Sequence, residues 1–207
     1  ACSWDTMPNL EKLWDGLKSI SKKDCTYAFT ASQPFTSILI MSNMKLFKYE
    51  WIWMKQQGTN PMLAHKRPLK IHENIVIFSQ GNPKYNPQME AGKPYSGYSS
   101  DVSTTGEIMG KTKSVHRENS EGTRFPVTII KINTERKKGG HPTQKPLSLM
   151  EYLVKTYTDI GDFVFDPFSG SGTTLVACRN LERKCVGVEI KKEYCEMCVK
   201  RLNDSFL

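Results

Sequence analysis

Hydrophobic residues in this chain alternate between a helical period and short continuous runs. Apolar side chains at helical spacing predict helices over residues 8–20, 32–43 and 141–159, with a further helix after the glycines near position 170. Runs of aromatic and β-branched residues predict strands at 25–31, 46–54, 73–80, 125–132, 162–166 and 185–190. Because strands and helices alternate, the pattern predicts an α/β protein with a doubly wound, mostly parallel sheet.

Regular patterning is lost between residues 81 and 140, where Gly, Pro, Ser, Asn and charged residues dominate. The whole chain has 207 residues, of which 38% are hydrophobic, enough for one core of ordinary size. We therefore predict one α/β domain made of two halves, residues 1–84 and 141–207, with residues 85–140 as an irregular insertion.

The positive charge is concentrated near this insertion. The chain has a net charge of +8, and residues 111–145 hold nine Lys or Arg against three Glu, a net charge of +6 for that segment. A focused basic surface attracts polyanions, so the segment predicts nucleic-acid binding. A solvated basic loop is the alternative.

The six cysteines lack the dense, regular spacing of a secreted disulfide scaffold, so we predict reduced thiols. Cys195 and Cys198 fall on one helix face, but no second Cys or His pair lies nearby, and we expect no metal site. No apolar run approaches the length of a membrane span, and the N-terminus does not resemble a signal peptide. These features predict a cytoplasmic protein that does not bind membranes.

The segment DPFSGSGTT joins a predicted strand to a predicted helix. Gly170 and Gly172 allow a tight turn and a close ligand, while Thr173 and Thr174 begin a helix whose free amides favour a negative group. Glu189 ends the next predicted strand, where an acid commonly binds ribose hydroxyls. The turn lacks the lysine of a P-loop and the third glycine of a dinucleotide site, so S-adenosylmethionine suits it best. A purely structural turn with a solvated Glu189 is the alternative.

DPFSGSGTT, with VGVEI after it and HPTQKP before it, resembles the site-specific DNA amino-methyltransferases, which modify adenine N6 or cytosine N4. In the permuted motif order of that family, the target-recognition insertion precedes the cofactor motifs. The resemblance extends through SQPFTS, YEWIWMKQQGTN, KRPLKIHENIVIF and YNPQM. It implies a restriction-modification type of enzyme that uses S-adenosylmethionine and acts on duplex DNA. Adenine N6 is the preferred target, and a homodimer is one expected assembly.

The resemblance also assigns roles by position. The residues predicted to bind the cofactor are Asp166, Phe168, Gly170, Gly172, Thr173, Glu189, Thr143, Gln144 and Lys145. Lys145 suits the methionine carboxylate, with a solvated lysine at a helix start as the alternative. The residues predicted to contact DNA are Arg124, Arg136, Lys137 and Lys138. Trp51 and Trp53 are expected to pack within the sheet rather than to stack on a base.

One motif of the family is absent. Its catalytic tetrapeptide is Asp, Asn or Ser followed by Pro-Pro and an aromatic residue, and none of the 207 residues provides it, because DPFS at 166 is the cofactor turn. The family places this motif on a central strand, just before a stretch like ACSWDT. We therefore predict no catalytic residue here, about 30 further residues before Ala1, and no activity for these residues alone. A DNA-binding protein that keeps the fold without catalysis is the main alternative. An RNA or small-molecule methyltransferase would leave the basic insertion unexplained.

Overall fold

The computed structural model describes residues 7–99, 115–135 and 143–204. The chain divides into two compact units. Residues 1–86 and 128–207 form the larger unit, and residues 87–127 form the smaller one. None of the described helices combines the length and the apolar character that a bilayer-spanning helix needs.

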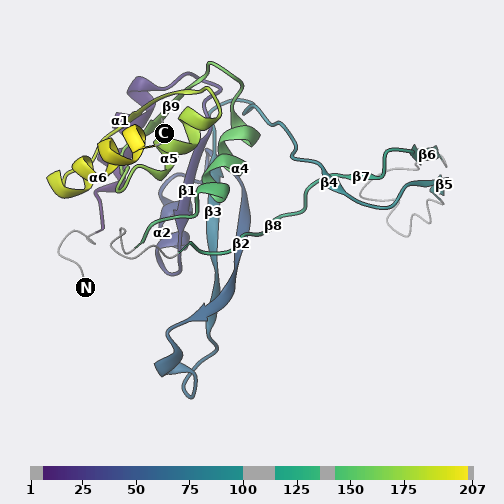
Figure 1. Cartoon of the computed structure of the whole chain (residues 1–207), viewed down its shortest axis with the longest axis horizontal. Coiled ribbons are helices and arrows are strands. Elements are labelled where there is room, and N and C mark those ends of the chain that lie inside the picture. Colours follow the sequence, from purple (N-terminus) through teal and green to yellow (C-terminus); the bar gives the residue numbers. More distant parts are fainter. Residues whose placement is uncertain (1–6, 100–114, 136–142, 205–207) are drawn as a thin grey trace. The chain divides into compact units, whose positions relative to one another are not determined.

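A four-stranded sheet in the order β1-β3-β2-β8 lies at the centre of the larger unit (Figure 1). Its strands are β1 (Tyr27–Ala31), β2 (Phe47–Thr59), β3 (Lys70–Phe78) and β8 (Ile129–Lys131). β3 is antiparallel to both of its neighbours, and β8 is parallel to β2, so three of the four strands share one direction. β3 is reversed because it follows β2 through a hairpin.

A second, two-stranded sheet pairs β9 (Phe163–Asp166) in parallel with β10 (Lys184–Gly187). Among the described residues, β9 pairs only with β10, and β1 pairs only with β3, so each strand has an open edge. Phe165 of β9 nevertheless packs against the buried cluster that includes Tyr27 and Ala31 of β1. The two open edges therefore border the same part of the core.

Helices cover both faces of the central sheet. They are α1 (Leu10–Ile20) and α2 (Phe35–Ser42) on one face, and α4 (Leu147–Tyr157) and α5 (Thr173–Asn180) on the other, while α6 (Lys192–Asn203) packs against α5. Along β3, Ile75 and Ile77 pack with α4 and α5, whereas Val76 and Phe78 pack with α1 and α2. Successive side chains of a strand point to opposite faces, so a strand covered on both sides needs a continuous apolar run. This explains why IVIF shows no polar alternation.

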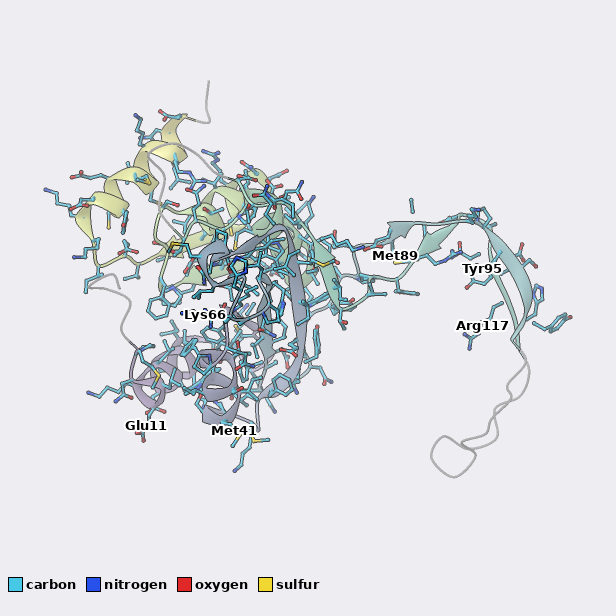
Figure 2. All side chains as sticks on the ribbon, turned by 90° about the horizontal axis from the view of Figure 1, so that it is seen from below. Glu11, Met41, Lys66, Met89, Tyr95 and Arg117 are labelled. Atoms are coloured by element: carbon cyan, nitrogen blue, oxygen red, sulfur yellow. The ribbon has the colours of Figure 1, made fainter. Side chains whose placement is uncertain are left out.

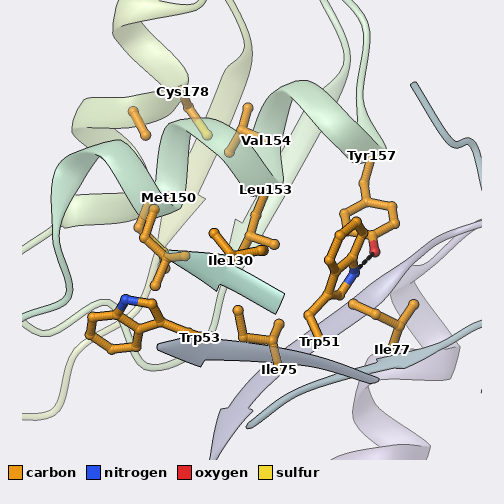
Figure 3. Packing of buried hydrophobic residues seen from close by; sticks show 12 residues of the cluster. Trp51, Trp53, Ile75, Ile77, Ile130, Met150, Leu153, Val154, Tyr157 and Cys178 are labelled. Carbon is orange, nitrogen blue, oxygen red and sulfur yellow. Dashed lines mark hydrogen bonds between the residues drawn. The ribbon is translucent and has the colours of Figure 1, made fainter. Parts of the chain in front are cut away.

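Trp51 and Trp53 lie in the core between the sheet and α4 (Figure 3). They are 3% and 2% exposed. The indole nitrogen of Trp51 donates to the Tyr157 hydroxyl at 2.6 Å, and that of Trp53 donates to the Ile132 carbonyl at 2.8 Å. Because both rings are buried with satisfied N–H groups, the prediction that they pack within the sheet is confirmed.

The described residues of the smaller unit form four short strands. β4 (Glu90–Ala91) pairs with β7 (Thr123–Arg124), and β5 (Tyr95–Ser99) pairs with β6 (Val115–Asn119), both antiparallel. The sequence pattern predicted an irregular segment here, and it was wrong about these strands. They carry mostly exposed residues, so no alternation of apolar and polar positions marks them.

Candidate cofactor site

The chain turns sharply between β9 and α5, at the carboxyl end of β9. Gly170 and Gly172 have φ angles of 49° and 75°, in the left-handed region that favours glycine. The Gly172 amide donates to the Ser169 carbonyl at 2.7 Å, which closes the turn. A Cβ on Gly172 would lie 2.2 Å from Sγ of Cys198 on α6. Backbone conformation and packing therefore both require glycine at 172.

Glu189 is held against this turn. Its Oε2 accepts a hydrogen bond from the Gly170 amide at 2.9 Å, and its Oε1 accepts one from the Lys191 amide at 2.9 Å. Each carboxylate oxygen can accept further bonds, so the group keeps acceptor capacity for hydroxyl donors. The sequence predicted a strand as far as residue 190, but β10 ends at Gly187, and Glu189 stands two residues beyond it.

The residues at the start of the turn have structural contacts of their own. Asp166 Oδ1 accepts the Phe168 amide at 3.0 Å, while the Phe168 ring is 61% exposed. The amide and hydroxyl of Ser169 both donate to the Val188 carbonyl, at 3.0 and 3.1 Å. These bonds tie the turn to the segment that follows β10, next to Glu189.

Arg201 on α6 supports the same turn from behind. Its Nη1 donates to the carbonyl and hydroxyl oxygens of Ser171 at 2.7 and 3.0 Å, and to Oγ1 of Thr173 at 3.1 Å. Burial lowers the pKa of the Arg201 guanidinium. Sequence reasoning missed this residue because it is one of several basic residues near the C-terminus, 30 positions from Ser171.

The start of α4 is joined to the turn through Gln144. Its Oε1 accepts a hydrogen bond from the Ser171 hydroxyl at 3.1 Å. Glu135 Oε1 accepts the Leu147 amide at 3.1 Å, which places a carboxylate at the N-terminus of α4, where the helix dipole favours it. Thr143 is exposed. The predicted cofactor residues thus come from segments 143–145, 166–173 and 189, and these contacts bring the three segments together.

Lys145 has an acidic partner inside the protein. Its Nζ lies 3.0 Å from Oε2 of Glu73, and Lys55 binds the other oxygen of the same carboxylate. Burial raises the pKa of the Glu73 carboxyl, but the charge of Lys145 and hydrogen bonds from both lysines outweigh it and leave the pKa below its usual range. No local sequence pattern marks this group of Lys55, Glu73 and Lys145, because its members lie far apart in the chain.

The predicted DNA-contacting residues are only partly described. Arg124 lies in the smaller unit, where its guanidinium donates to the carbonyls of Thr123 and Lys93 and lies 4.8 Å from the centre of the Tyr95 ring. Arg136, Lys137 and Lys138 lie outside the described residues.

The five described cysteines are free thiols, as predicted, and Cys2 lies outside the described residues. Burial raises the pKa of the Cys178 thiol to about 12. Within the described ranges, no group of three or more His, Cys, Asp or Glu residues is arranged to hold a metal ion.

A sequence profile of the DNA methylase family, which covers N6 and N4 methyltransferases, matches residues 5–200. The chain belongs to the N6/N4 DNA methylase family. The resemblance seen in the sequence motifs is thereby confirmed at the level of the family.

Individual relatives agree with this membership. The DNA methylase chain is 46% identical over 189 residues to the type II methyltransferase M.HpaI of Haemophilus parainfluenzae, covering 84% of this chain and 55% of that protein. It is 38% identical over 151 residues to the type II methyltransferase M.Cfr9I of Citrobacter freundii, covering 73% of this chain and 42% of that protein. The chain spans about half the length of the curated relatives it matches.

Solved structures show the same fold. The crystal structure of an M1.HpyAVI–SAM complex superposes with a TM-score of 0.65 at 26% identity, covering 97% of this chain and 85% of the other. The cytosine-N4-specific PvuII DNA methyltransferase gives a TM-score of 0.65 at 16% identity, covering 93% and 70% of the two chains. The latter likeness shows the fold alone. The predicted methyltransferase-type α/β fold is confirmed.

Proposed function

We propose that this DNA methylase binds S-adenosylmethionine at the glycine turn and that the protein transfers the methyl group to adenine N6 in duplex DNA. The observation that carries the proposal is the Glu189 carboxylate, fixed between the amides of Gly170 and Lys191 at the carboxyl ends of two parallel strands. Ligands of open α/β sheets bind at this edge, and an acid there suits ribose hydroxyls.

The residues of the turn fit such a cofactor. Glycines at 170 and 172 leave no side chain between the backbone and a ligand, and the N-terminus of α5 favours the amino-acid carboxylate. When bound, S-adenosylmethionine supplies a methyl group carried on a positively charged sulfur. The solved M1.HpyAVI–SAM complex supports this cofactor for a structure of the same fold.

The side chains around the turn would then have different roles in binding the cofactor. Glu189 would orient the ribose, and the exposed Phe168 ring would cover a neighbouring part of the ligand. Arg201 and Gln144 would act as positioning residues, because both bind Ser171. Since Glu73 engages Lys145, we assign Lys145 to holding the 143–145 segment in place, with the methionine carboxylate as a second partner.

A catalytically inactive DNA-binding protein that keeps this fold is the second candidate. The observation in its favour is that none of the 207 residues provides the family's Pro-Pro-aromatic tetrapeptide. That tetrapeptide is needed because an exocyclic amine is a poor nucleophile, and acceptor groups must hold it against the methyl donor beside a flipped base. A homodimer and a cytoplasmic location remain predictions.

We expect the methylated product to be N6-methyladenine. The test uses an active preparation, by which we mean this chain together with a segment that carries the catalytic tetrapeptide. Duplex DNA is incubated with labelled S-adenosylmethionine, digested to nucleosides and analysed by mass spectrometry. Detection of N4-methylcytosine instead would identify cytosine as the target. The absence of any methylated nucleoside would favour the inactive DNA-binding protein.

Replacing Glu189 by Ala should weaken S-adenosylmethionine binding by about 1 to 3 kcal/mol, the scale of a lost hydrogen bond to a charged group. Calorimetry on the active preparation measures this. Glu196→Ala is the matched control, because it removes an exposed glutamate from α6 and should leave the affinity unchanged. Equal affinities for the two variants would remove Glu189 from the cofactor site.

A further inference from the structure

The β2–β3 hairpin continues past the core of the larger unit as an arm, defined here as residues 56–72. The two strands pair as far as Met54 and His72, and after an irregularity Thr59 pairs with Lys70. The last buried positions before the arm are Trp53 and Asn74, and no residue between these two is buried. Figure 1 shows that this hairpin extends beyond the helices of the larger unit. A segment with no fully buried residue contributes little to the core, so its length calls for another explanation.

The arm carries positive charge only. It contains Lys66, Arg67 and Lys70 and no Asp or Glu. None of the three forms an ion pair with another described residue. Met62, at the same tip, is 93% exposed. Figure 2 views the molecule from the side to which the arm points and labels Lys66. The tip therefore presents cations and an apolar side chain to the solvent.

Hydrogen bonds within the tip give it a defined shape. Asn60 has a left-handed φ of 62°, and a short 3-10 helix, η1 (Pro61–Leu63), follows it. The amides of Lys66 and Arg67 both donate to the Leu63 carbonyl, at 2.9 and 3.0 Å. The backbones of the two cationic residues are therefore part of a hydrogen-bonded turn, and such preorganisation lowers the entropy lost when a partner binds.

Contacts of Gln144 and Lys145 link the base of the arm to the cofactor turn. The arm begins at the carboxyl end of β2, and the glycine turn lies at the carboxyl end of β9. Two adjacent residues link the two places: Lys145 pairs with Glu73 at the base of the arm, and Gln144 accepts from Ser171 in the glycine turn. A base presented to a cofactor at that turn would bring its flanking nucleotides toward the arm.

We propose that the arm is a second DNA-binding element, separate from the insertion, and that Lys66, Arg67 and Lys70 neutralise backbone phosphates next to the target base. The proposal rests on the proposed function. A two-stranded β-ribbon is narrow enough for the major groove of DNA, and a surface of one positive sign complements a polyanion. A second copy of the chain fits less well, because two such tips would repel each other.

The experiment compares two triple variants of the active preparation. Lys66→Ala, Arg67→Ala and Lys70→Ala together should lower the log–log salt slope of DNA binding by about 0.9 for each lost phosphate contact, and raise Kd on the order of tenfold or more. Lys155→Ala, Lys184→Ala and Lys200→Ala remove the same charge from exposed positions outside the arm and should keep the parent slope. Fluorescence anisotropy on a short duplex, at several salt concentrations, measures both.

S-adenosylmethionine affinity separates this inference from the proposed function. It should be unchanged in the arm variant, because the arm does not touch the glycine turn. A parent protein that binds neither the cofactor nor DNA would contradict the proposed function itself. If the parent binds both, equal slopes for the two triple variants would overturn the role of the arm. A slope that falls together with loss of a dimer in sedimentation would overturn it as well.

Discussion

Residues 1–207 produced alone should transfer no methyl group to DNA and should be unstable or aggregate. Adding a segment that carries the catalytic tetrapeptide should give the same residues both stability and activity. The tetrapeptide consists of Asp, Asn or Ser followed by Pro-Pro and an aromatic residue. That segment can be fused before Ala1 or supplied as a separate polypeptide. Incorporation of labelled methyl groups into duplex DNA, together with thermal unfolding of both preparations, measures the difference.

The reason lies in the sheet as well as in the missing motif. Among the described residues, β1 and β9 each have one open edge, and Phe165 of β9 packs against the same cluster as β1. A strand between them would pair with both. Each buried backbone group left without a partner costs about 1 to 3 kcal/mol, against a total stability of about 5 to 15 kcal/mol. Open edges also invite pairing between chains, which leads to aggregation.

A segment with the tetrapeptide mutated to alanines separates the two effects. It should restore stability, because it still pairs with both edges, but it should not restore methyl transfer. Methyl transfer by residues 1–207 alone would show that the catalytic group lies within them, and our placement of the chemistry would be wrong.

Gly172→Ala should destabilise the protein by about 2 to 6 kcal/mol and abolish measurable binding of S-adenosylmethionine. Left-handed backbone at a non-glycine residue costs about 1 to 3 kcal/mol, and overpacking adds a similar amount. Overpacking applies because the new Cβ would lie 2.2 Å from Sγ of Cys198. Thermal or urea unfolding and calorimetry on the active preparation measure the two effects.

Two further variants sharpen this prediction. Cys198→Ala, combined with Gly172→Ala, should recover part of the stability, because it removes the clashing sulfur but not the strain at φ 75°. Gly16→Ala is the control, since a Cβ there meets nothing within 4 Å, and it should stabilise α1 by about 0.5 to 1 kcal/mol. Destabilisation by Gly16→Ala equal to that by Gly172→Ala would contradict the argument from packing.

Features that depend on neighbouring residues could be predicted from the sequence. The apolar stripe of α1, the continuous run of β3 and the segment DPFSGSGTT are local patterns, and each gave the element or turn that the structure contains. The family followed from the same local motifs. Periodicity and turn chemistry act over a few residues, so a single chain read in order reveals them.

Contacts between distant residues become visible only in the folded chain. The pairing of Glu73 with Lys145 and the bonds from Arg201 to Ser171 join residues that are far apart in the chain. The sequence does not identify these partners, because the residue type of a charged side chain is the same whether it is solvated or paired. The strands of the smaller unit and the exposed arm were hidden for a related reason: they bury too little to impose a hydrophobic pattern. Backbone pairing between segments, rather than burial, places them.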